Sequence, residues 1–269
     1  VGDPPNLLIG SAAGIDFLTF AANLAPIALL ILIVLLGLSW FLFGKDLRDG
    51  RSGALDIEAL EAEALIADRS LLRKTLVVTV GVIVGFLMHG ALHLEPATIA
   101  LAGATILLLW GRSDPHHILR EVEWTTLVFF IGLFITVEAI VQVGIIEAVA
   151  EAALRLTGGS LQLTSMMLLW LSAVGSGIVD NIPYTATLIP VVENLGQSMP
   201  IMPLWWSLAL GACLGGNATL VGAAANVVVA SLAARSGHPI SFKRFLGYGL
   251  VITVMSLLLA TGYVWLRYL

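Results

Sequence analysis

The sequence contains little charge: only 12% of its 269 residues are Asp, Glu, Lys or Arg, against about 25% in ordinary soluble domains. It has one cysteine, Cys213, which excludes an internal disulfide and any multi-cysteine metal site. This cysteine stands in an apolar run, where a buried, inert thiol is expected. The net charge of -5 provides no basic surface, so nucleic acid is not expected as a partner.

What remains is strongly apolar. Hydrophobic residues make up 58% of the chain, and the mean hydropathy is +0.98. A water-soluble fold of this composition has too few polar residues to cover its surface. The sequence therefore predicts an all-α polytopic membrane protein.

Several segments match the length of about 20 apolar residues that a helix needs to cross a bilayer. Full spans are predicted at residues 24–44, 75–95, 96–111, 124–142 and 245–266. Between the first two spans lies a polar stretch, residues 45–74, which holds 13 of the 31 charged residues. Apolar residues recur in it at helical spacing and predict an amphipathic helix at the membrane surface: Ile57, Leu60, Ala64, Ala67 and Leu71.

The distribution of Lys and Arg predicts the orientation in the membrane. If residues 45–74 are cytoplasmic, 11 of the 13 Lys and Arg residues face the cytoplasm, and only Arg155 and Arg267 lie outside. The expected location is the bacterial inner membrane, with the C-terminus outside. This topology requires residues 161–198 to leave and return on one side, either by crossing twice or as a re-entrant hairpin.

Two parts of the sequence resemble each other. Val221-Gly222-Ala-Ala-Ala-Asn226 matches Val1-Gly2-Asp-Pro-Pro-Asn6, and one hydrophobic span follows each copy. The predicted topology gives these two spans opposite directions, which is typical of inverted-repeat secondary transporters. The chain opens in the middle of this motif, so most of a first repeat is expected to be missing.

The repeat divides the chain into three parts. Residues 1–44 are expected to be the end of the first repeat, with the second half of a broken helix and one transmembrane helix. Residues 45–74 are a cytoplasmic linker. Residues 75–269 form the second repeat: three transmembrane helices, an interfacial helix at about 143–157, a re-entrant hairpin at about 161–198, a broken helix at about 203–235 and a last transmembrane helix at about 245–266.

One interruption of the apolar pattern, at residues 214–226, is rich in glycine. Gly215, Gly216 and Gly222 fall within eight residues, which is costly in a helix that merely spans the membrane. They predict a helix that unwinds in mid-membrane, where free carbonyl groups and polar side chains can line a cavity. The alternative is close packing of helices through small residues.

The other interruption, at residues 174–190, carries the dipeptide Asp180-Asn181. One of these residues is expected to cap the second arm of the hairpin, and Pro183 suits the first turn of that arm. Capping alone would explain an Asp here. An ionisable residue deep in a membrane is nevertheless a functional candidate, because protons and cations can compete for one carboxylate.

At these motifs the sequence resembles the ion transporter superfamily, in particular the ArsB/NhaD-type permeases with a citrate-transporter-like domain, and within them the branch of the melanosomal P protein. The resemblance covers essentially the whole chain and rests on four motifs in order: Val1-Gly-Asp-Pro-Pro-Asn6, Val122-Glu-Trp-Thr-Thr-Leu127, Asp180-Asn-Ile-Pro183 with Thr185-Ala-Thr187, and Gly215 to Asn226. It implies alternating access, a hairpin and a broken helix in each repeat, and a scaffold that forms a homodimer.

The resemblance also implies an ion site where the hairpin and the broken helices meet. Asp180, Asn181 and Asn217 are the expected sodium ligands. The full set of expected site residues is Asp180, Asn181, Pro183, Thr185, Thr187, Gly216, Asn217, Thr219, Gly222 and Asn226, with Asp3 and Asn6 from the first repeat. No cofactor is expected apart from a bound Na⁺ or H⁺.

Within this superfamily the substrate varies among sodium and protons, arsenite, and citrate or dicarboxylates. Asp180 and Asp3 would repel a multivalent anion unless cations neutralised them. This favours cation/proton exchange over arsenite efflux and over citrate or dicarboxylate transport. A more distant alternative is an intramembrane aspartyl protease, but Val179-Asp180 does not match its Gly-x-Gly-Asp pattern. We therefore expect a transporter, not an enzyme, whose substrate is a small inorganic ion or a small anion.

Overall fold

The computed structural model describes residues 3–49, 68–92, 94–112 and 114–269, and all the regular elements in these ranges are helical. Five of the helices are long and apolar enough to cross a membrane: Phe17–Leu42, Arg69–Leu92, Trp124–Gln142, Leu161–Ile178 and Phe242–Tyr268. The prediction of a polytopic all-helical membrane protein is confirmed.

The observed helices differ from the predicted spans in two places. Residues 96–111 form α4 (Pro96–Gly111), which has only 16 residues and is shorter than a full span. In contrast, α8 (Leu161–Ile178) has the length of a span although the pattern around it is interrupted. The predicted amphipathic helix lies mostly outside the described residues, and Leu71 falls within α3 (Arg69–Leu92).

The chain divides into two compact units, and the smaller one comprises residues 16–19 and 33–126. It contains α3, α4 and the short helix α5 (Pro115–Arg120). Helices α3 and α4 pack closely: a Cβ atom added at Gly103 would lie 2.3 Å from a methyl carbon of Val82. The Lys74 ammonium group donates a hydrogen bond to the carbonyl oxygen of Trp110 at 3.0 Å, and so satisfies an acceptor at the end of α4.

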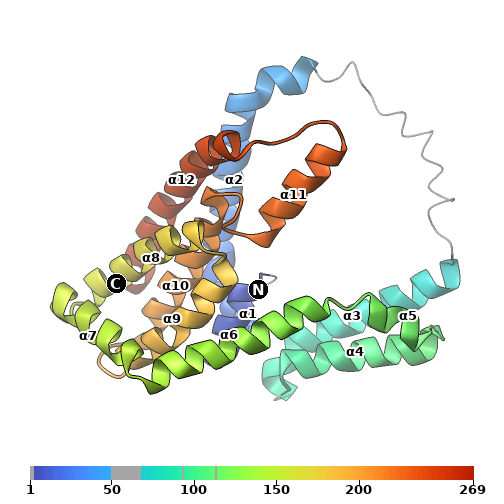
Figure 1. Cartoon of the computed structure of the whole chain (residues 1–269), viewed down its shortest axis with the longest axis horizontal. Coiled ribbons are helices and arrows are strands. Elements are labelled where there is room, and N and C mark those ends of the chain that lie inside the picture. Colours follow the sequence, from blue (N-terminus) through green and yellow to red (C-terminus); the bar gives the residue numbers. More distant parts are fainter. Residues whose placement is uncertain (1–2, 50–67, 93, 113) are drawn as a thin grey trace. The chain divides into compact units, whose positions relative to one another are not determined.

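The larger unit comprises residues 1–15, 20–32 and 127–269. Helix α10 (Ile201–Gly215) is its centre, because most of its residues are buried. Against α10 pack α1 (Pro4–Ala12), α8, α9 (Asn181–Leu195) and α12 (Phe242–Tyr268) (Figure 1). The remaining elements are part of α2 (Phe17–Asp49), most of α6 (Trp124–Gln142), α7 (Ile145–Thr157), the 3₁₀ turn η3 (Gly216–Ala218) and α11 (Ala224–Arg235).

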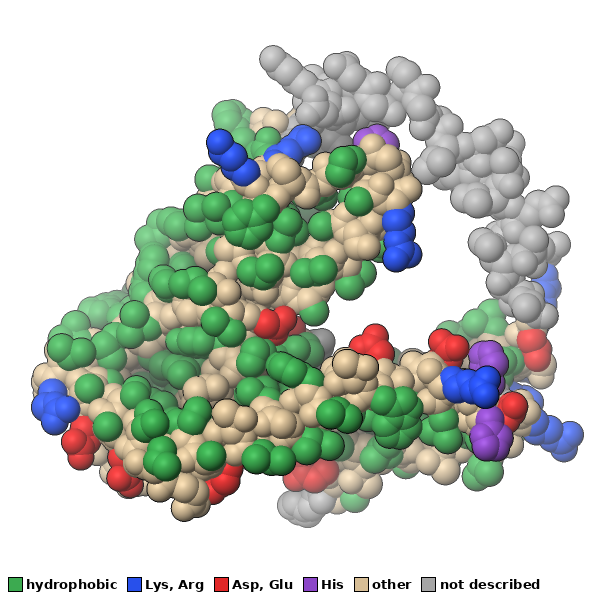
Figure 2. All heavy atoms as spheres, viewed as in Figure 1, with side chains coloured by type: hydrophobic (Ala, Val, Ile, Leu, Met, Phe, Trp, Pro, Cys, Tyr) green, Lys and Arg blue, Asp and Glu red, His purple; other side chains and the backbone are tan. Residues whose placement is uncertain are grey.

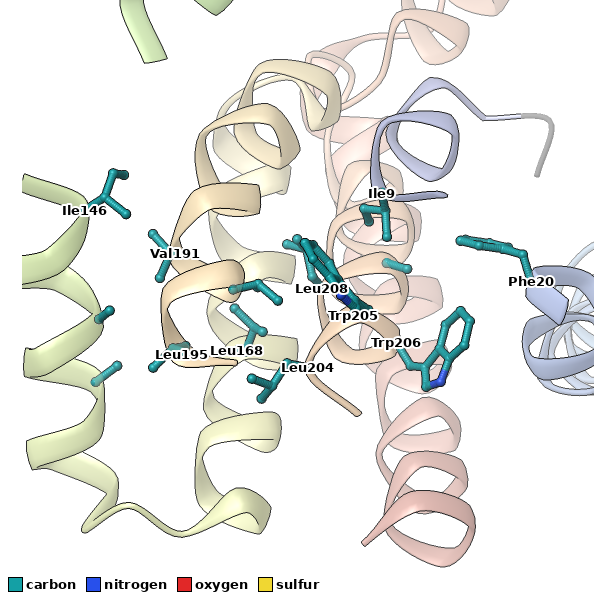
Figure 3. Close-up of a cluster of buried hydrophobic side chains, with 14 residues drawn as sticks. Ile9, Phe20, Ile146, Leu168, Val191, Leu195, Leu204, Trp205, Trp206 and Leu208 are labelled. Atoms are coloured by element: carbon teal, nitrogen blue, oxygen red, sulfur yellow. The ribbon is translucent and has the colours of Figure 1, made fainter. Parts of the chain in front are cut away.

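Large side chains of α10 fill the core of this unit (Figure 3). Trp205 and Trp206 are almost fully buried, and the ring of Trp206 meets that of Phe20 edge to face, with centroids 5.4 Å apart. Ile9 of α1 is fully buried and belongs to the same cluster. The core therefore joins α1 to helices from the second half of the chain.

Small residues bring the backbones of α8 and α10 together. A Cβ atom added at Gly211 would lie 2.4 Å from the carbonyl oxygen of Leu169, and one at Gly215 would lie 2.3 Å from that of Ala173. The Ser176 hydroxyl donates to the carbonyl oxygen of Ala212 at 2.6 Å. Because lipid chains are as apolar as the side chains, such close contacts and hydrogen bonds hold membrane helices together.

Helix α7 has two distinct faces. Its buried residues recur at helical spacing: Ile146, Ala150, Ala153 and Thr157. The opposite face carries Glu151 and Arg155, whose charged groups lie 3.6 Å apart with both side chains about 70% exposed. Figure 2 shows charged side chains gathered over α7, while hydrophobic ones cover much of the visible surface of the neighbouring helices. A helix with these faces suits a membrane–water interface.

Candidate functional site

The link between α8 and α9 places Asp180 at the tip of a helical hairpin. Helix α8 ends at Ile178, Val179 is extended, Asp180 is the N-cap, and α9 begins at Asn181. One carboxylate oxygen of Asp180 accepts a hydrogen bond from the backbone N–H of Ile182 at 2.9 Å, so Asp180 caps α9 as the sequence predicts. The two arms pack tightly, because a Cβ atom at Gly175 would lie 2.1 Å from the ring of Tyr184.

A second interruption follows α10. The helix ends at Gly215, continues as the 3₁₀ turn η3, becomes extended at Thr219, and resumes only at Ala224 as α11. The glycines are required here by close approach. A Cβ atom at Gly216 would lie 2.8 Å from the carbonyl oxygen of Gly222, and one at Gly222 would lie 2.6 Å from that of Gly216.

The hairpin tip and this broken helix are in direct contact. The backbone N–H of Asn181 donates to the carbonyl oxygen of Gly222 at 3.1 Å. The hydroxyl of Thr219 donates to the carbonyl oxygen of Gly177 at 2.7 Å, and it accepts from the N–H of Gly222 at 3.0 Å. The two interruptions read from the sequence therefore form one junction, with the Asp180 carboxylate at its edge.

Asn226 holds the unwound segment in shape. Its side-chain Nδ2 donates to the carbonyl oxygens of Gly216 and Thr219, both at 2.9 Å. These carbonyl groups lack helical partners because the helix is broken there. Asn226 thus has a structural task in addition to the ligand role expected from the sequence.

The N-terminal residues Asp3 to Asn6 reach the same end of α10. Asp3 precedes α1, and α1 packs on α9 and α10. The side-chain oxygen of Asn6 lies 3.4 Å from the sulfur of Cys213, three residues before Gly216, and Asp3 is a neighbour of the same thiol. The structure therefore brings Asn6 to the helix that leads into the junction.

The other expected site residues differ in their surroundings. Asn181 and Thr185 are buried, and the Thr185 hydroxyl is fully buried without a hydrogen-bond partner. The Thr187 hydroxyl donates to the carbonyl oxygen of Pro183, one turn earlier in α9, so its hydrogen bond is made within the helix. Asn217 is exposed.

Three glycines and a cysteine in or beside the junction have roles that the sequence does not indicate. Gly249 of α12 allows close approach, because a Cβ atom there would lie 2.7 Å from the carbonyl oxygen of Asn217. Gly177 would place a Cβ atom 3.2 Å from the carbonyl oxygen of Gly215, and Gly175 accommodates the Tyr184 ring. A glycine inside an apolar helix gives no sign of which neighbour it accommodates, and Cys213 carried no motif.

These features define a polytopic helical membrane protein in which a hairpin tip meets a broken helix, an arrangement suited to moving a small solute. The chain belongs to the citrate transporter family, whose model matches residues 1–211. An uncharacterized transporter of Mycobacterium tuberculosis is 46% identical over 272 residues, which cover all of this chain and 63% of the relative. The chain thus spans less than two thirds of that relative's length.

Two further relatives are a 46 kDa membrane protein of Mycobacterium leprae and the P protein of Mus musculus. The first is 44% identical over 273 residues, covering all of this chain and 64% of its own. The second is 39% identical over 222 residues, covering 78% of this chain and 27% of its own. No solved structure matches the chain significantly.

Proposed function

We propose that this chain binds the transported ion in a secondary active transporter. The transporter exchanges a cation, most simply sodium, for protons by alternating access. The observation that carries the proposal is the position of Asp180. Its carboxylate stands where the hairpin tip meets the broken helix, and one of its oxygens is used for capping α9. An acidic group at such a junction can bind a cation in one step and a proton in another.

The neutral ligands come from the surrounding polar groups. Asn181 and Asn217 complete a sodium site with Asp180 in this proposal, and Thr185 adds a buried hydroxyl that has no other partner. Oxygen ligands of this kind suit hard cations. Helices α8 and α10 end at the junction while α9 and α11 begin there, so negative and positive helix ends oppose each other and the Asp180 carboxylate supplies the negative charge that attracts a cation.

The family's description as citrate transporters supports a second candidate, the transport of citrate together with neutralising cations. Citrate carries several negative charges, so it would meet repulsion from Asp180 and Asp3 unless cations bound first. Arsenite, which is neutral at pH 7, would meet no such repulsion and is the third candidate.

The proposal places the chain in the bacterial inner membrane with residues 45–74 in the cytoplasm and the C-terminus outside. The complete transporter contains a first repeat whose hairpin faces the motif at Asp3 to Asn6, and it works as a homodimer. The greater length of the mycobacterial relatives leaves room for such a repeat.

Proton flux in everted vesicles carrying the complete gene product tests the function. Sodium or lithium is expected to drive proton movement in the wild type and not in Asp180→Asn, which keeps the shape and the capping oxygen but removes the charge. Glu193→Gln is the matched control, since Glu193 is an exposed carboxylate of the same helix. A cation response that persists in Asp180→Asn would contradict the assignment. Proton or label movement driven by citrate or arsenite alone would favour those substrates.

A further inference from the structure

A histidine of α3 contributes to the start of α2. Helix α2 begins at Phe17, and the first N–H groups of a helix have no partner within it. The backbone N–H of Phe17 donates to Nε2 of His89, 72 positions later in the chain, at 2.8 Å. Asp16 satisfies another of these groups, because its carboxylate accepts from the backbone N–H of Thr19 at 2.9 Å. One histidine and one aspartate therefore hold the first turn of α2.

The hydrogen bond to His89 depends on the protonation of its ring. An imidazole nitrogen accepts only while it carries no hydrogen, so this bond requires neutral His89 with its hydrogen on Nδ1. Proton uptake at Nε2 turns the acceptor into a donor, which then faces the N–H of Phe17, and the bond is lost. Histidine side chains ordinarily change charge between pH 5 and 8. His89 and Phe17 are both half-buried, so water reaches the ring.

Asp16 is the acid that lies beside the same ring. It packs against this turn of α3, since a Cβ atom added at Gly90 would lie 3.1 Å from Cβ of Asp16, and His89 is close enough for its charge to act on the Asp16 carboxyl. Helix α4, which packs on α3, contains no titratable residue, and Glu95 precedes it. His93 lies outside the described residues. Asp16 is thus the partner to which a protonated ring turns.

We propose that His89 and Asp16 form a regulatory proton-binding site at the start of α2. Neutral His89 holds the N–H of Phe17, whereas protonated His89 releases it and pairs with the Asp16 carboxylate. Proton uptake thus loosens the first turn of α2, whichever ion the protein transports. The next turn carries Phe20, whose ring meets that of Trp206 in the core of the larger unit, so the site acts on a helix to which both units contribute residues.

Hydrogen exchange at the Phe17 amide tests the site, in the complete gene product in detergent, with fragmentation and mass spectrometry to resolve that amide. His89→Gln is the matched variant, because its amide oxygen accepts a hydrogen bond but takes up no proton. Comparison at one pH cancels the change of the intrinsic exchange rate with pH. We expect the two rates to agree within about two-fold at pH 8, and the wild type to exchange about five-fold faster at pH 5, the factor for one hydrogen bond. A ratio that is the same at both pH values would overturn the proposal.

His89→Ala provides a second comparison that does not depend on the reach of the glutamine side chain. It lacks the acceptor, so the wild type is expected to exchange about five-fold more slowly than His89→Ala at pH 8 and at the same rate at pH 5. Leu92→Ala, a change at an exposed residue of α3, is expected to follow the wild type. A wild type that matches His89→Ala at pH 8, or that stays slower at pH 5, would overturn the proposal.

Asp16→Asn tests the second partner. Asparagine keeps an oxygen that caps the helix but removes the charge that favours a protonated ring. The rise in exchange at Phe17 is therefore expected to begin at a lower pH than in the wild type. A rise at the wild-type pH would overturn the pairing of His89 with Asp16.

Discussion

The backbone N–H of Asn181 donates a hydrogen bond to the carbonyl oxygen of Gly222 at 3.1 Å, and this bond joins the hairpin tip to the broken helix. Both groups belong to interrupted helices, whose free backbone groups must find partners inside a membrane protein. This hydrogen bond therefore satisfies one backbone group of each interrupted helix. The two interrupted segments form one junction, next to the Asp180 carboxylate.

Gly222→Ala is expected to separate the two segments. The added methyl group would lie 2.6 Å from the carbonyl oxygen of Gly216 and 3.0 Å from that of Ser176, and both are backbone atoms that cannot move alone. Overpacking of this kind costs about 1–3 kcal/mol, so we expect a lower unfolding temperature in detergent and a loss of transport. Gly262→Ala in α12 is the control, because no atom lies within 4 Å of its added methyl group. Wild-type stability and flux in Gly222→Ala would show that the junction does not require this close approach.

Asn226→Asp tests whether the amide nitrogen shapes the broken segment. Aspartate has the same size but replaces the donor by an acceptor, so the carbonyl oxygens of Gly216 and Thr219 lose this donor and face a negative charge. The carbonyl oxygen of Thr219 still accepts from the N–H of Gly222 at 3.4 Å. A buried acceptor left without a donor costs about 1–3 kcal/mol. We expect Asn226→Asp to lower the unfolding temperature at least as much as Asn226→Ala. A residue that acted only as a cation ligand would behave differently, because aspartate would then strengthen cation binding and leave stability intact.

The positions of the interruptions could be predicted from the sequence because local chemistry determines them. Glycines at 215, 216 and 222, and an acid next to an amide at 180 and 181, stand out in an apolar run. The cap of α9 by Asp180 could be predicted for the same reason, since it depends on a donor only two residues away.

The contacts between distant segments could not be predicted in this way. The expected free carbonyl groups of Gly216 and Thr219 are occupied by Asn226, which only the fold of the broken segment brings within reach. The apolar run around Cys213 predicts an inert thiol, and nothing local indicates its contact with Asn6, which lies 207 positions earlier in the chain. No local pattern carries such a pairing.

Acid is expected to weaken the start of α2 through Asp16, which lies just before the first span. Hydrogen bonds from the hydroxyl and the backbone N–H of Thr19 lower the pKa of the Asp16 carboxyl below its ordinary value of 3.8. The folded state therefore favours the charged form. The resulting stability is present above pH 3.8 and is lost as the pH falls through the lowered pKa.

Thermal unfolding in detergent between pH 7 and pH 3 checks this expectation. Asp16→Asn should unfold at a lower temperature than the wild type at pH 7, and the difference should shrink in acid. Asp114→Asn is the comparison, because Asp114 caps a short exposed helix, α5, through one backbone bond. A difference between wild type and Asp16→Asn that stays constant down to pH 3 would show that the charge of Asp16 does not stabilise this helix start.

Thr185→Val separates a role in ion binding from a role in packing. Valine has nearly the same shape, and the Thr185 hydroxyl is fully buried without a partner, so its removal relieves the cost of an unsatisfied polar group. We therefore expect the stability of the empty protein to stay the same or to rise by about 1 kcal/mol. If the hydroxyl is a cation ligand, the KM for sodium should nevertheless rise several-fold, and added sodium should stabilise the variant less than the wild type. Thr187→Val is the control, since that hydroxyl donates to Pro183 within α9. An unchanged KM in Thr185→Val would remove Thr185 from the proposed site while leaving the role of Asp180 intact.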